Sequence, residues 1–100
     1  PNRIEVLLRL TTTLSENNQV FIEDPDVVKQ LLLDNIESRY SLGKNFEPQK
    51  YFSVVDAPWA SQVLLEWSDD NGSNYHSTVF DADFDDIFVV LLENIELVEE

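Results

Sequence analysis

The 100-residue sequence contains no cysteine, no methionine and only two glycines. The absence of cysteine excludes disulfide bonds, thiolate zinc sites and cysteine nucleophiles. Gly43 and Gly72 are far apart in the sequence, so they do not form the glycine-rich loop that cradles a phosphate. No apolar run approaches the roughly 20 residues that a spanning helix requires. These absences predict a cytoplasmic protein that does not cross a membrane.

Positive charge is scarce, and it is confined to one half of the chain. Residues 1–50 hold all six basic residues and eight acidic ones, whereas residues 51–100 hold twelve acidic residues and no basic one. The resulting net charge of −14 disfavours direct binding to nucleic acid or to an anionic membrane, because both require a basic footprint. The field of such a protein steers positively charged partners instead, so we expect a basic protein as the partner.

The residues that are present favour a single folded domain over residues 1–100. Hydrophobic residues make up 43% of the chain and aromatic residues 11%, which is enough for one core. Partial alternation of apolar residues predicts a strand over residues 3–14. Residues 19–23 predict a second short strand that pairs with the first in a hairpin.

Residues 24–40 carry the clearest signals of a helix. Asp24 can cap the free amides of the first turn, and Pro25 suits the first helical position. Apolar residues recur at helical spacing and predict the buried face, which consists of Val28, Leu31, Leu32 and Ile36.

Three further strands are expected in the second half of the chain. Residues 50–56 have the apolar and aromatic content of a strand, which ends before Pro58. Residues 62–67 and 74–80 flank a loop that contains Asn71-Gly72, which is a strong short-range signal for a hairpin.

The segment 84–98 fits two different elements. As a helix, it places six apolar residues on one face, namely Phe84, Ile87, Phe88, Leu91, Leu92 and Ile95. As a strand, it requires a continuous buried run followed by alternation. We predict a helix capped by Asp81 or Asp83. Its outward face would carry an acidic stripe made of Asp86, Glu93, Glu96 and Glu100.

The acidic segment DADFDD, residues 81–86, resembles a cation site only superficially. Closely spaced carboxylates suit calcium, but an EF-hand loop that begins at Asp81 needs glycine at its sixth position and glutamate at its twelfth. The chain has Asp86 and Leu92 there. The oxygen-rich residues 68–74 are explained by a hairpin turn. We therefore predict no metal and no cofactor, and a calcium-binding module remains a third alternative.

The sequence carries no strong catalytic motif. His76 is the only histidine, and its neighbours predict a surface or cross-strand position. No serine is flanked by the glycines of a nucleophile elbow. We predict that the protein is not an enzyme.

The two tryptophans differ in their surroundings. Trp67 shares the predicted inward face of its strand with Leu65, so core packing explains it. Trp59 follows Pro58 in an irregular stretch and either packs under a loop or anchors a partner, because aromatic side chains are enriched at interaction hot spots.

These patterns predict an α+β fold, with an antiparallel sheet of four to five strands and two helices packed on one face. The predicted function is that of a non-enzymatic inhibitor or immunity-type protein, whose acidic, nucleic-acid-mimicking surface blocks a basic nucleic-acid-binding protein or nuclease. The alternative is an acidic adaptor or subunit that binds a protein partner through an apolar surface in a larger assembly. Under the first hypothesis the partner-binding residues are Asp69, Asp70, Asp81, Asp83, Asp85, Asp86, Glu93, Glu96 and Trp59.

Overall fold

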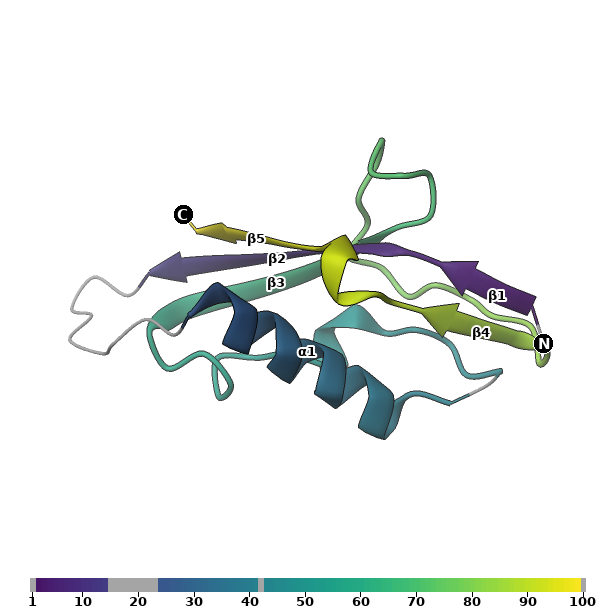
Figure 1. The fold of residues 1–100 in the computed structure, drawn as a ribbon, viewed down its shortest axis with the longest axis horizontal. Helices are drawn as coiled ribbons and strands as arrows, with labels where there is room; N and C mark the ends of the chain where they lie inside the picture. Colours follow the sequence, from purple (N-terminus) through teal and green to yellow (C-terminus); the bar gives the residue numbers. More distant parts are fainter. Residues whose placement is uncertain (1, 15–23, 42, 100) are drawn as a thin grey trace.

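The computed structural model describes residues 2–14, 24–41 and 43–99, and within these residues it has one α-helix and five strands (Figure 1). The strands are β1 (Asn2–Glu5), β2 (Leu7–Leu14), β3 (Ala60–Ser68), β4 (Asp86–Val89) and β5 (Ile95–Glu99). The helix is α1 (Pro25–Arg39), and two short 3-10 helices are η1 (Pro48–Lys50) and η2 (Leu92–Asn94). The predicted α+β class is confirmed.

Residues 2–14 are the spine on which both sheets are built. β1 pairs in parallel with β4, and β2 pairs in parallel with β5 and antiparallel with β3, which gives the strand order β3-β2-β5. Only Val6 separates β1 from β2, and its N–H donates to the Val89 carbonyl at 3.3 Å. The predicted strand over residues 3–14 is therefore divided at Val6. The predicted antiparallel sheet of four to five strands is matched only in part: the five strands form two sheets, β1-β4 and β3-β2-β5, and only the β2–β3 pairing is antiparallel.

The helix forms where its capping signals predicted it. The Asp24 carboxylate accepts a hydrogen bond from the Asp26 N–H at 2.8 Å, and Pro25 occupies the first turn. Val28, Leu32 and Ile36 are buried as predicted, whereas Leu31, which was predicted to share that face, is 38% exposed. The buried residues pack into the same core as the inward residues of β2 and β3, so α1 covers one face of the three-stranded sheet (Figure 1).

The prediction of a second helix in the C-terminal segment is wrong. Residues 84–98 form β4, η2 and most of β5, each strand beside a part of the N-terminal spine. The helical face does not exist, because Phe84 is 89% exposed and Leu91 is 41% exposed. Backbone pairing with distant strands, which a helical period cannot reveal, stabilises the extended form.

Of the other predicted strands, only the one over residues 62–67 is confirmed, within β3. Residues 50–56 form the end of η1 and turns, because Tyr51 and Phe52 are both buried and so leave no alternation. Residues 74–80 form isolated bridges, Trp67 with His76 and Phe46 with Phe80, and no strand. The predicted strand over residues 19–23 lies outside the described residues.

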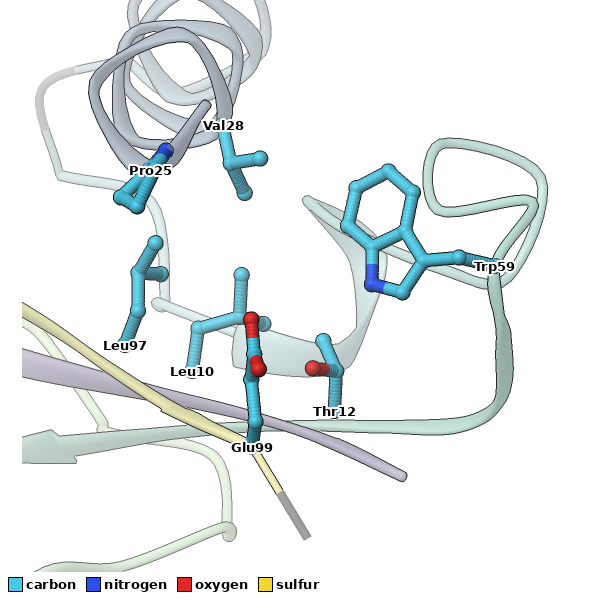
Figure 2. Close-up of a pocket in the computed structure, with 7 residues that line it drawn as sticks. All are labelled: Leu10, Thr12, Pro25, Val28, Trp59, Leu97 and Glu99. Carbon is cyan, nitrogen blue, oxygen red and sulfur yellow. The ribbon is translucent and has the colours of Figure 1, made fainter. Parts of the chain in front are cut away.

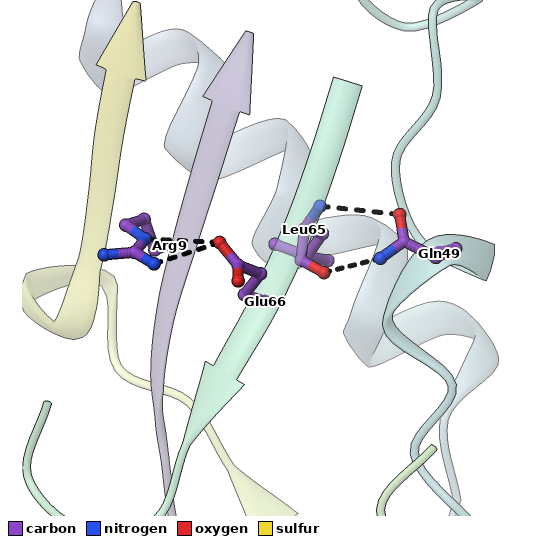
Figure 3. A network of polar contacts seen from close by, with 4 residues as sticks. All are labelled: Arg9, Gln49, Leu65 and Glu66. Atoms are coloured by element: carbon purple, nitrogen blue, oxygen red, sulfur yellow. Dashed lines mark hydrogen bonds and ion pairs between the residues drawn. The ribbon is translucent and has the colours of Figure 1, made fainter. Parts of the chain in front are cut away.

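Side chains stabilise β3 on both sides (Figure 3). On one side, Arg9 of β2 pairs with Glu66 at 3.1 Å. On the other side, the Gln49 amide donates to the Leu65 carbonyl at 2.7 Å and accepts from the Leu65 N–H at 3.5 Å. The Gln49 side chain thus takes the place of a further strand at the outer edge of β3.

Candidate interaction surface

The 81–86 turn, which comprises residues 81–86 with the sequence DADFDD, is fixed by its backbone. Asp86 N–H donates to the Asp83 carbonyl at 3.0 Å, and Asp83 N–H donates to the Asp86 carboxylate at 2.9 Å. Two residues of one neighbouring segment add bonds: Gly43 N–H donates to the Asp86 carbonyl at 2.8 Å, and the Asn45 side chain accepts from the Ala82 N–H at 2.9 Å. The turn is therefore held against the 43–45 segment.

Phe84, at the centre of this turn, points into solvent and is 89% exposed. Its backbone lies so close to Gly43 that a Cβ atom on Gly43 would be 2.7 Å from the Phe84 carbonyl oxygen. Asp81, Asp83 and Asp85 around it are exposed as well. The arrangement is an aromatic side chain framed by carboxylates on a fixed backbone. The sequence analysis assigned Phe84 to a buried helical face and missed it as a surface residue, and the signal that could have found it is the flanking aspartates.

The Asp86 carboxylate supports the turn through hydrogen bonds and was predicted instead to contact a partner. Besides the bond from Asp83 N–H, its carboxylate accepts a hydrogen bond from the Asn2 side chain at 3.2 Å. Asn2 N–H also donates to the Asp85 carbonyl at 2.7 Å. Asp86 therefore joins the turn to the start of β1.

Asp69 and Asp70 lie in a second loop, residues 68–74, which projects from the middle of the molecule, away from the 81–86 turn (Figure 1). Asn71 and Gly72 have φ angles of 60° and 88°, as a tight turn between strand-like segments requires. Asp69 is exposed beside Glu5 and Asn94. The acidic residues predicted to form one surface are thus divided between two loops.

The Asp70 carboxylate is the acceptor that holds this second loop. It accepts hydrogen bonds from the Ser68 hydroxyl at 2.6 Å, from the Asn74 N–H at 3.0 Å and from the Asn74 side chain at 2.9 Å. These bonds lower the pKa of Asp70 from 3.8 to about 2, and the bond from Ser68 has the largest effect. Asp70 is consequently a structural carboxylate.

Glu93 and Glu96 do not continue a stripe from Asp86, so that prediction is wrong. Glu93 is exposed in η2, and Glu96 is on β5. Glu96 is in register with Arg9, on the sheet face opposite α1. On this face Arg9 also lies 4.1 Å from the ring centre of Tyr75. Glu100 lies outside the described residues.

Trp59 was predicted either to pack under a loop or to anchor a partner. Its side chain is 3% exposed, which agrees with packing under a loop, and it lines a small cavity with Leu10 and Val28 (Figure 2). Its indole Nε1–H is buried without a hydrogen-bond partner among the described residues. An exposed anchoring role for the Trp59 ring is therefore not retained. Phe84 takes that place in the hypothesis.

Basic residues from the N-terminal half lie closer to the acidic turn than the sequence suggests. Arg3 of β1 is in register with Ile87 of β4, and Lys44 directly follows Gly43. Lys44 also lines a groove with Arg39 and Lys50 at the end of α1. Charge that is segregated along the chain is therefore partly mixed in space.

Within residues 2–14, 24–41 and 43–99, no group of three histidine or carboxylate side chains is placed to hold a metal ion. His76 is exposed, and its ring centre lies 4.7 Å from that of Trp67, which confirms the predicted cross-strand position. In the same part of the chain, no helix is both long and apolar enough to cross a membrane.

The chain matches no protein-family model, no curated protein and no solved structure. Its function therefore has to be argued from the surface itself.

Proposed function

We propose that this protein is a non-enzymatic inhibitor or immunity-type protein that docks its 81–86 turn on a basic protein that handles nucleic acid. The supporting observation is the 89% exposure of Phe84 between exposed aspartates on a fixed turn. A rigid aromatic anchor supplies apolar contact area at little entropic cost, while the surrounding carboxylates steer a cationic groove towards it. The carboxylates would occupy positions that phosphates take in the normal complex.

The fixed backbone matters to this proposal. A turn that is held by hydrogen bonds before binding loses less conformational freedom when it binds, so more of the contact energy appears as affinity. Asp86 belongs to the support of the turn, and Asp81, Asp83 and Asp85 belong to its surface.

The adaptor alternative depends on a different surface. Apolar residues on α1 and around η2, two elements in contact, are partly exposed, with exposed fractions of 53% for Val27, 38% for Leu31, 41% for Leu91 and 38% for Leu92. A partner bound there would remain bound at high salt, because apolar contacts are not screened.

The test compares three immobilised baits in lysate from the source organism and its competitors: the wild type, Phe84→Ser and Val55→Ser. Val55 is the matched control, because it is 87% exposed in another turn. We expect basic nucleic-acid-binding proteins on the wild type and on Val55→Ser, a loss of at least tenfold on Phe84→Ser, and release by moderate NaCl or by added duplex DNA. Equal retention on all three baits, or retention that persists in high salt, would contradict the proposal.

A further inference from the structure

The loop of residues 68–74 contains Asn71-Gly72, a pair that the proposed function does not use. Asn71 is the only asparagine of the chain that precedes a glycine. The backbone nitrogen after an asparagine can attack the side-chain amide carbon, and glycine presents the least hindered nitrogen because it has no side chain. The pair can therefore undergo deamidation, a covalent change that needs only water.

The loop exposes the Asn71 side chain to this reaction. Asn71 lies in the exposed part of the loop, and its φ of 60° and that of 88° at Gly72 place both residues in a tight turn. A Cβ atom at Gly72 would stand 3.4 Å from the nearest side-chain atom, on Leu7. The absence of that atom leaves the approach to the Gly72 nitrogen open.

The closed loop nevertheless holds the Gly72 nitrogen back. Its N–H donates to the Ser68 hydroxyl at 3.0 Å, and the same hydroxyl donates to the Asp70 carboxylate at 2.6 Å. The N–H has to leave Ser68 before the nitrogen can lose its proton and reach Cγ of Asn71. The reaction rate in the folded protein is therefore reduced by the free energy of opening this loop.

We propose that Asn71 is a site of spontaneous deamidation, and that the hydrogen bonds of Ser68 to Gly72 and Asp70 slow this reaction in the folded protein. The Gly72 nitrogen gives its proton to the solvent and forms a bond to Cγ of Asn71. The bond from Cγ to Nδ2 breaks as the leaving nitrogen takes up protons and departs as ammonia. Water then opens the resulting succinimide to aspartate or isoaspartate. Water is consumed and ammonia released, without oxidation or reduction.

The product changes the charge and the backbone of the loop. Asn71 lines a shallow groove together with Glu5, Asp69 and Asn94. Conversion adds a further carboxylate beside those of Glu5 and Asp69, and like charges repel one another. Isoaspartate also inserts a side-chain carbon into the backbone. Both changes oppose the closed loop, so its amide protons should exchange faster after conversion. The site does not involve the 81–86 turn and is independent of the proposed function.

The test follows the conversion of amide to acid in the full-length protein at neutral pH by mass spectrometry. Cleavage after glutamate releases residues 67–93, in which Asn71 and Asn74 are the only asparagines. We expect conversion at Asn71, at a rate roughly tenfold below that of the same chain unfolded in urea. Asn74 precedes Tyr75 and is the internal control, so it should not convert.

Two variants test the role of the Ser68 hydroxyl. Ser68→Ala should deamidate about fivefold faster than the wild type, because the loss of one hydrogen bond favours the open loop. Ser73→Ala is the matched control, since Ser73 is an exposed serine of the same loop, and it should react at the wild-type rate. Equal rates in the wild type and in Ser68→Ala would overturn the control by Ser68. An intact Asn71 in the folded protein, under conditions in which the unfolded chain converts fully, would overturn the site itself.

Discussion

Asp70 shows, at the scale of a single residue, that an aspartate in an acidic protein need not be a surface charge. It accepts three hydrogen bonds, from Ser68 and from two groups of Asn74, and so closes the 68–74 loop. A protonated carboxyl would lose part of this acceptor capacity. The loop and the ionisation of Asp70 are therefore coupled.

The pH dependence follows from the direction of this coupling. The pKa of Asp70 is lowered from 3.8 to about 2 in the folded state, so the carboxylate stabilises that state at pH values above 3.8. This contribution is lost as the pH falls from 3.8 through about 2. We expect an NMR titration of the Asp70 carboxyl carbon to have its midpoint near 2.

The matched variant for this prediction is Ser68→Ala, which removes the hydroxyl donor that lowers the pKa of Asp70 most. We expect the pKa of Asp70 to rise towards its ordinary value and the amide signals of residues 70–74 to broaden. An unchanged Asp70 midpoint in Ser68→Ala would mean that the hydroxyl does not set the pKa.

The 81–86 turn and the segment beside it show how one element supports another. Gly43 has a φ of 77°, and its missing Cβ lets it approach the Phe84 carbonyl. Gly72 has a φ of 88°, but a Cβ there would meet only side-chain atoms, at 3.4 Å and beyond. Both glycines have a left-handed backbone, and only Gly43 has a backbone neighbour in the way.

We therefore predict that Gly43→Ala lowers the free energy of unfolding more than Gly72→Ala does. The φ angle alone costs about 1 kcal/mol in either variant, and the clash with Phe84 adds a further cost on the order of 1 kcal/mol. Urea unfolding of the two variants measures the difference. Gly43→Ala should also displace Phe84 and weaken partner capture, and equal destabilisation by both variants would count against the close approach.

Gln49 supports β3 as a strand would, and its replacement has two expected effects. Gln49→Ala removes the bonds to both backbone groups of Leu65 and should lower the free energy of unfolding by about 1 kcal/mol. It also opens the edge of β3, so association at high protein concentration should increase. Gln62→Ala is the control, because Gln62 is an exposed glutamine on β3 itself. Size-exclusion chromatography and urea unfolding together test both effects.

The elements differ in how far the sequence predicts them, for a physical reason. α1 was predictable because its cap, at Asp24 and Pro25, and its buried face are local features. β4 and β5 were not, because their apolar residues fit a helical period and their stability comes from pairing with β1 and β2, more than 80 residues away. Phe84 was wrongly assigned to a buried position for the same reason, because its spacing from the next apolar residues fits the apolar face of a helix.

At the scale of the whole molecule, the sequence predicts only part of the proposed acidic binding surface. The sequence identified the acidic segments and the turn at Asn71-Gly72. It could not show that Asp70 and Asp86 are hydrogen-bonded into their own loops, or that folding brings the 43–45 segment against the 81–86 turn. A charge count along a chain describes the field at long range, and contact roles depend on tertiary structure.

The net charge of −14 makes a prediction in which folding and binding respond to salt with opposite signs. Self-repulsion opposes the folded state, so screening it with NaCl between 10 and 300 mM should raise the free energy of unfolding by about 1 kcal/mol. Attraction to a basic partner is screened by the same ions, so the association rate should fall over that range. The Asp81→Asn, Asp83→Asn, Asp85→Asn triple variant should show a smaller salt effect in both measurements, because it lacks three negative charges and retains Asp86 as the support of the turn. Urea unfolding and stopped-flow association with the captured partner supply the two slopes. A stability that falls with salt would show that attractive pairs such as Arg9–Glu66 outweigh the self-repulsion.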